Sequence, residues 1–112
     1  ANRLAKEDNA LSLIADASFQ EVLVFSSNNE VVLKRSVYRE LPDAIRVRLL
    51  QIAFANLKGN TLDLNSDQLG KMDELSVGTK KTATYRLPAS CRFVLTEDCV
   101  KILQEETNKD RP

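Results

Sequence analysis

The stretch "GTKKTATYRLPASCRFVL", residues 78–95, decides the fold because it holds two alternating runs joined by a Leu-Pro corner. Apolar side chains alternate with polar ones in both runs, at Ala83, Tyr85, Leu87, Phe93 and Leu95. After an acidic turn, Val100 and Ile102 alternate again. A period of two is typical of strands that bury one face. The sequence therefore predicts a small antiparallel β-meander, with Arg86 and Arg92 on the face that points away from the core.

The part of the chain before the meander predicts helices and one short strand. Residues 3–24 carry apolar side chains at three- and four-residue steps, which is typical of an amphipathic helix. A polar turn at residues 26–29 ends this helix, and the β-branched content of residues 30–34 favours a short strand. Ser36 is the expected cap of a single helical turn that runs to Arg39.

Two longer helices are predicted next. Pro42 suits the first position of a helix, because its missing N–H has no partner there, and Gly59 follows the end of this helix. Asn65 and Gln68 have the spacing of a capping box, which begins another helix that ends at Gly78. The predicted fold class is therefore α+β: a helix, a short strand, two helices, then the small antiparallel β-meander.

Length and composition describe one ordinary domain. The chain has 112 residues, of which 43% are hydrophobic and 29% are charged, and this suffices for a single core. No apolar run approaches the ~18 residues that cross a membrane, and nothing near the start resembles a signal peptide, so we expect a cytoplasmic protein. We assign residues 1–104 to the domain, with residues 1–24 as its leading helix, and residues 105–112 to a polar tail. Cys91 and Cys99 are expected to be reduced strand residues, with a cross-hairpin disulfide as the alternative.

The residue types that common catalytic mechanisms need are missing from the sequence. There is no histidine, so the usual general base and the commonest metal ligand are absent. No glycine-rich phosphate loop and no Gly-x-Ser-x-Gly elbow occur. The paired carboxylates are sequence neighbours at predicted helix surfaces or turns, where solvated charges are the rule. We therefore expect no catalytic residue, no metal site and no cofactor on this chain, which reads as a binding or accessory domain.

The basic residues are concentrated in two segments, although the formal net charge is zero. Residues 31–48 carry five basic and two acidic side chains, and residues 79–101 carry the same numbers. Neutralising phosphates requires several cations on one face, so the two segments together predict a polyanion surface. Tyr38 and Tyr85 are candidates for stacking on unpaired bases, whereas the four phenylalanines are assigned to the core. The candidate cations are Lys34, Arg35, Arg46, Arg48, Lys80, Lys81, Arg86 and Arg92.

Four stretches together resemble the domain that follows the catalytic domain in bacterial tRNA(Ile)-lysidine synthase. These are "RLAKEDNALSLIADA", "LPDAIRVRLLQIAF", "LNSDQLGKMDEL" and "GTKKTATYRLPASCRFVL", and they occur in the order of the family over roughly residues 2–103. The chain departs from the family at two places. Ala89-Ser90 replace the glycine that usually follows the Leu-Pro corner, and Val94 and Leu95 stand where further arginines are common.

The resemblance implies a role in tRNA modification. The full enzyme of that family uses ATP to adenylate the wobble cytidine of a minor isoleucine tRNA and then joins lysine to it, while the following domain helps to hold the tRNA. Its Ser-Gly-Gly-x-Asp-Ser loop is missing here, so ATP and lysine would be used by a catalytic domain outside this sequence. The implied partners are the isoleucine tRNA and the catalytic domain of the same polypeptide, with no membrane. Carried over by position, the implied tRNA-binding residues are Arg46 and Arg48 of the Leu-Pro helix, Lys80 and Lys81 of the loop, and Arg92 after the corner.

Two alternatives compete with the tRNA-recognition hypothesis. The order of helices and strands also fits a winged-helix DNA-binding module, but residues 66–76 carry three acidic side chains against Lys71, which is a poor match to a major groove. The second alternative is a protein-interaction domain that contacts another domain of the same polypeptide through the apolar helix 42–57.

Overall fold

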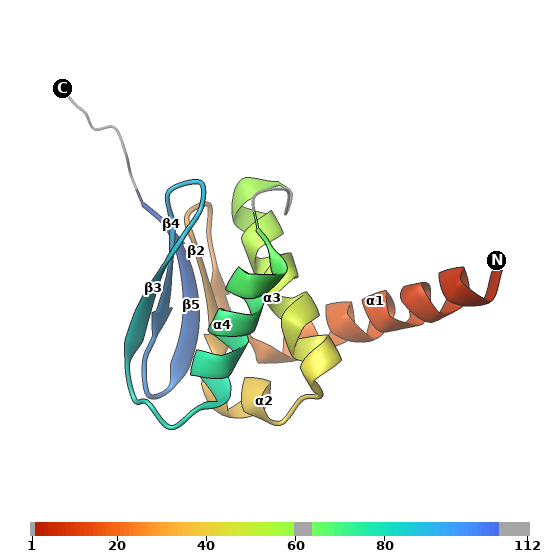
Figure 1. Ribbon diagram of the computed structural model, residues 1–112, viewed down its shortest axis with the longest axis horizontal. Coiled ribbons are helices and arrows are strands. Elements are labelled where there is room, and N and C mark those ends of the chain that lie inside the picture. Colours follow the sequence, from red (N-terminus) through yellow and green to blue (C-terminus); the bar gives the residue numbers. More distant parts are fainter. Residues whose placement is uncertain (1, 60–63, 106–112) are drawn as a thin grey trace.

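A computed structural model describes the protein over residues 2–59 and 64–105, with side chains described from residue 12 onward. In this part of the chain, helices form one layer and a single sheet forms the other (Figure 1). The predicted α+β class is confirmed. The elements are α1 Asn2–Val22, β1 Leu23–Ser26, β2 Glu30–Lys34, α2 Arg35–Arg39, α3 Asp43–Lys58, α4 Ser66–Val77, β3 Ala83–Leu87, β4 Cys91–Leu95 and β5 Cys99–Gln104.

The sheet is larger than the predicted three-stranded meander. Its five strands are all antiparallel and lie in the order β1-β2-β5-β4-β3. The two N-terminal strands therefore join the C-terminal meander along β5, which occupies the middle of the sheet. Figure 1 shows the helices on one side of the sheet, so that its other face, the outer face, is left uncovered by any described helix.

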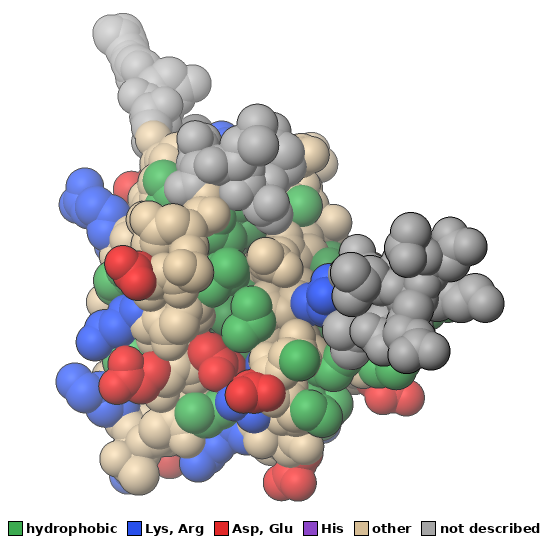
Figure 2. Space-filling model, turned by 45° about the vertical axis from the view of Figure 1, so that its right-hand side comes forward, with side chains coloured by type: hydrophobic (Ala, Val, Ile, Leu, Met, Phe, Trp, Pro, Cys, Tyr) green, Lys and Arg blue, Asp and Glu red, His purple; other side chains and the backbone are tan. Residues whose placement is uncertain are grey.

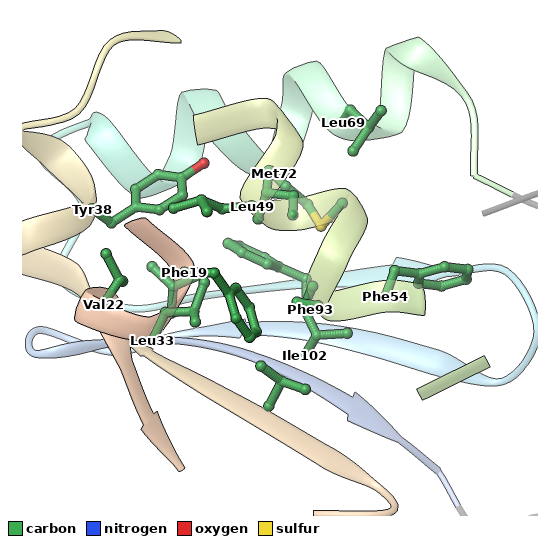
Figure 3. Packing of buried hydrophobic residues seen from close by; sticks show 14 of the residues in the cluster. Phe19, Val22, Leu33, Tyr38, Leu49, Phe54, Leu69, Met72, Phe93 and Ile102 are labelled. Atoms are coloured by element: carbon green, nitrogen blue, oxygen red, sulfur yellow. The ribbon is translucent and has the colours of Figure 1, made fainter. Parts of the chain in front are cut away.

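The core lies between the inner face of the sheet and the helices (Figure 3). Phe93 and Ile102 rise from the sheet towards α3 and α4, while Phe19 enters from α1. Strand alternation decides which residues contribute, because only one residue in two can face the helices. The inner residues of β4 and β5 are accordingly buried, as the sequence predicted.

The first helix ends earlier than its predicted boundary at residue 24. It stops at Val22, and Leu23–Ser26 form β1, which pairs with β2 as a hairpin around a polar turn. In that turn the Ser27 amide donates to the Glu30 carbonyl at 2.8 Å. Pairing with β2 outweighs local helix propensity here, because Val24 and Phe25 belong to residue types that also favour strands.

The local signals at the other helix ends are mostly borne out. Asn65 and Gln68 exchange both hydrogen bonds of the capping box at the start of α4. Gly59 has a φ of 85° after α3, a left-handed conformation that favours glycine. Pro42 lies one residue before the first helical residue. The prediction that Ser36 caps α2 is wrong: the helix starts at Arg35, whose amide donates to the Asp98 carbonyl in the β4–β5 turn.

The β3–β4 turn contains an unusual pair of residues. Ala89 and Ser90 both have a φ of 60°, which L-residues with a Cβ rarely adopt. These are the positions at which the chain departs from the glycine of the resembling family. Cys91, just after this turn, and Cys99 are free thiols on strands, so the disulfide alternative does not apply. Of the polar tail predicted for residues 105–112, all but Glu105 lies outside the described residues.

Candidate nucleic-acid interface

The strand register arranges the outer face of the sheet into two rows. One row crosses all five strands through Thr84, Val94, Lys101, Val32 and Phe25. The other row runs through Arg86, Arg92, Leu103 and Glu30. Directly paired residues of neighbouring strands lie on the same face of a sheet. Arg86 and Arg92 therefore do face away from the core, as the sequence predicts.

Charge is distributed unequally between the two layers. By sequence, the five strands carry four basic residues and one acidic residue, whereas the four helices carry eight of each. All four strand cations, namely Lys34, Arg86, Arg92 and Lys101, alternate with buried residues and so belong to the outer face. Figure 2 shows Lys and Arg side chains along the left margin, the side on which Figure 1 shows the sheet, and acidic side chains on the helical face.

Arg86 and Arg92 are directly opposite each other on β3 and β4. Like charges in this position repel each other and destabilise a sheet. Arg92 is paired with Glu105, just beyond β5, while Arg86 is exposed. The outer face thus concentrates positive charge at a cost to its own stability, which an anionic ligand would relieve.

An apolar pair lies at the opposite side of the same face, on β1 and β2. Val32 is only 7% exposed, yet it lies outside the core cluster, because it points to the outer face. Its partner on β1 is Phe25, which is 51% exposed. The prediction that Phe25 belongs to the core is therefore wrong. Phe25 lies on the edge strand β1. Because it pairs with Val32, which points to the outer face, Phe25 also points to the outer face.

Arg35 is the one charged side chain in the buried class among the described residues, with 3% of its surface exposed. Its guanidinium donates to carbonyl oxygens of α4, of the following loop and of the β4–β5 turn. Burial, with the nearby charge of Arg39, lowers the pKa of Arg35, but an arginine starts so high that it stays charged. The accepting carbonyls and distances are Lys80 2.7 Å, Ser76 3.0 Å, Thr96 3.0 Å, Gly78 3.1 Å, Leu75 3.5 Å and Lys81 3.5 Å.

Arg46 is likewise occupied within the fold. Its Nε lies 2.7 Å from Asp73 Oδ1 and its Nη2 lies 3.0 Å from Oδ2, a bidentate pair between α3 and α4. Its Nη1 donates to the Leu41 carbonyl at 2.6 Å. The hydrogen bond to Asp73 raises the pKa of Arg46. Tyr38 completes the cluster, donating its hydroxyl to Asp73 Oδ1 at 2.8 Å.

The remaining candidates divide between the two layers. Lys80 and Lys81 are exposed in the loop before β3, and their carbonyls are those that Arg35 holds. Arg35 also places this loop next to the start of α2, and therefore next to Lys34. Arg48 lies on the helical layer, lining a hollow with Ser12, Asp16, Gln51 and others between α1 and α3. The two basic segments thus meet at Lys34 and the loop, while Arg46 and Arg48 lie away from the outer face.

Two residues of the outer face were missed by sequence reasoning. Lys101 lies between Val32 and Val94, and its alternation with the buried Val100 and Ile102 was the signal that could have found it. Phe25 had no such signal, because the sequence predicts a helix up to residue 24 and a polar turn at residues 26–29. The prediction that Tyr38 is available for base stacking is wrong, since the side chain has no exposed surface.

We expect Tyr38 to make stability depend on alkaline pH. Burial, followed by the charge of Asp73, raises the pKa of Tyr38 far above its usual value, so the folded phenol stays protonated when the unfolded one ionises near pH ~10. The stabilisation that Tyr38 gains from its raised pKa is fully present below about pH 10. Above that pH the free energy of unfolding falls by up to about 1.4 kcal/mol per pH unit. Tyr38→Phe is expected to cost about 1.5–3 kcal/mol at neutral pH and less at about pH 11, measured by urea unfolding.

The matched control for this measurement is Tyr85→Phe. Tyr85 is partly exposed on β3, so removal of its hydroxyl should cost less stability at neutral pH than Tyr38→Phe. A difference between wild type and Tyr38→Phe that stays constant from about pH 9 to about pH 11 would contradict the assignment.

Neither a scan against protein-family models nor a search of the curated proteins returns a match to this chain. Within the described ranges, no group of three or more carboxylate or thiol side chains is arranged to hold a metal ion. No described helix is both long and apolar enough to cross a membrane.

Proposed function

We propose that this chain is a tRNA-recognition domain of a tRNA(Ile)-lysidine synthase. The observation that carries the proposal is the convergence of four strand cations on the uncovered outer face, beside the lysine-bearing loop. The order of the four resembling stretches points to the same family. The domain would hold the anticodon arm of the minor isoleucine tRNA while a catalytic domain modifies its wobble cytidine.

In this proposal the domain contacts phosphates of the tRNA. The set of contacting residues differs from the one predicted from the sequence. Lys34, Lys80, Lys81, Arg86 and Arg92 remain from the sequence prediction, and Lys101 is added. Arg35 and Arg46 act indirectly, because their guanidinium groups are already engaged within the fold. Phosphate contacts fix position and orientation on an RNA without reading its sequence.

The chemistry belongs to the other domain of the proposed enzyme. ATP and lysine would bind to that catalytic domain, and none of the residues of the outer face takes part in adenylation or lysine transfer. The compartment that fits this role is the cytoplasm, where tRNA is modified and where Cys91 and Cys99 would stay reduced.

The protein-interaction alternative loses its proposed surface. It relied on the apolar face of α3, but Leu49, Leu50, Ala53 and Phe54 have no exposed surface because they pack against the core of this chain. The winged-helix alternative relied on α4 as a recognition helix. Its Asp73 is paired with Arg46, and no observation on the remaining acidic surface of α4 favours DNA.

Binding of unmodified isoleucine tRNA to the chain tests the proposal. We expect binding at ~50 mM salt that weakens as salt is raised, because each phosphate contact contributes about 0.7–0.9 to the slope of log K against log salt. Replacing Lys80 and Lys81 together by alanine should reduce that slope by about 1.4–1.8. Replacing Lys58 and Lys71 of α3 and α4 is the matched control and should leave the slope unchanged.

Specificity is tested with a second tRNA that has a different anticodon arm. The proposal requires weaker binding to this tRNA than to the isoleucine tRNA. Absence of binding at ~50 mM salt, or an affinity indifferent to salt, would contradict direct phosphate contact.

A further inference from the structure

We infer that the outer face of the sheet binds unpaired nucleotides, with Phe25 as a stacking residue and the strand cations as phosphate contacts; this inference rests on the proposed RNA-binding role. It specifies which form of RNA the surface takes. The arrangement that carries it is an exposed aromatic ring in the same cross-strand row as Lys101, with Arg86 and Arg92 at the opposite side of the face, on β3 and β4.

The apolar part of this surface favours bases over duplex backbone. Phe25 is half exposed, and its cross-strand partner on the same face is Val32, which is 7% exposed. On the same face, Val94 of β4 and Leu103 of β5 are partly exposed. In an A-form duplex the base faces are stacked inside, and the accessible surface is sugar and phosphate. An apolar, aromatic platform therefore gains contacts only when bases are unpaired.

The spacing of the cations suits one strand that crosses the sheet. Neighbouring strands lie about 4.8 Å apart, so the row from Thr84 to Phe25 extends over roughly 19 Å. Lys101 lies in the middle of this row, and Arg86 and Arg92 lie at its β3 and β4 end. A short single strand can follow such a path with its bases against the apolar residues and its phosphates near the cations.

Charge favours RNA over a protein as the occupant of this face. The strands carry four cations against Glu30, and Glu105 is paired with Arg92. Glu97 and Asp98 of the β4–β5 turn line one hollow with Lys34, so the positive charge of the face rests on Arg86, Arg92 and Lys101. A docking protein would have to present an acidic surface to these cations. Base stacking on an aromatic side chain contributes regardless of sequence.

The test compares one RNA in two forms. The probe is an unstructured RNA of about eight nucleotides, used alone and annealed to its complement, with binding followed by fluorescence anisotropy. We expect Phe25→Ala to weaken binding of the single strand by roughly 5- to 100-fold and to leave duplex binding within about twofold. Arg86→Ala should weaken both forms, because both carry phosphates.

Leu13→Ala is the matched control for an exposed apolar residue. Leu13 is 69% exposed on α1, and its removal should change neither affinity. If single-strand binding is unaffected by Phe25→Ala, or if the duplex binds more tightly than the single strand, the inference is overturned. Isoleucine tRNA that still binds through Lys80 and Lys81 would then leave the proposed function standing. Conversely, single-strand binding that needs Phe25, with no preference for the isoleucine tRNA, supports the inference and contradicts the proposed function.

Discussion

Arg35→Met is expected to lower the free energy of unfolding by about 3–5 kcal/mol. The substitution keeps much of the apolar stem but removes the donors that six buried or half-buried carbonyls use. Carbonyls left without partners away from water are costly, and no other described side chain donates to these six, although the Leu75 carbonyl also accepts from the Gly78 amide. Because small domains are stabilised by only about 5–15 kcal/mol, this is a large fraction of the total. Urea unfolding should show a midpoint lowered by about 2 M.

Arg39→Met is the control for the loss of an arginine from α2. Arg39 is exposed on the same short helix, so its removal should change stability by no more than about 0.5 kcal/mol. Equal effects of the two substitutions would mean that the carbonyls around Arg35 find water instead. Circular dichroism before unfolding separates a destabilised Arg35→Met protein from one that does not fold.

Reversing two charges on the sheet side should reduce RNA affinity on the order of 100-fold at low salt. The variant is Lys80→Glu with Arg86→Glu, which removes two cations of the loop and β3 and adds two repulsive carboxylates. Both side chains are exposed, and a glutamate at position 86 would face Arg92, so the variant should be at least as stable as the wild type. Anisotropy with isoleucine tRNA at ~50 mM salt is the measurement.

The control applies the same change in net charge to the helical layer. Lys58→Glu with Lys71→Glu alters α3 and α4. When both double variants are compared at ~100 mM salt, where charges beyond a Debye length of about 10 Å are screened, this control should change affinity by less than about threefold. If both double variants lose affinity equally, net charge rather than the outer face would control binding.

Much of the fold follows from local signals in the sequence. Strand alternation in β3, β4 and β5 and the caps of α3 and α4 could be read because each depends on residues within a few positions of one another. The pairing of β2 with β5 could not be predicted from such local patterns. It pairs residues that are distant in sequence, and no local pattern reports which strands become neighbours. The same limitation concealed β1, whose strand conformation depends on pairing with β2.

The candidate site was predictable in part for a related reason. Alternation places Arg86 and Arg92 on the outer face without any knowledge of the tertiary fold. Arg35 could not be recognised as buried, because its six acceptors are backbone carbonyls of residues 75–81 and of Thr96, far from it in the sequence. The residue type alone does not distinguish an exposed arginine from a buried one that hydrogen-bonds backbone carbonyls of two loops.

The position of β5 has a consequence for how the chain folds. The hairpins β1–β2 and β3–β4 are each local, but they are joined only through β5, the strand that lies last in the chain. During synthesis both hairpins can form early, yet each lacks a lateral neighbour until residue 104 has been made. Pairing between distant segments pays the entropy of loop closure before it gains contacts, and such topologies fold slowly. We therefore expect the outer face to become continuous only when β5, which pairs locally with β4, also pairs with the distant β2.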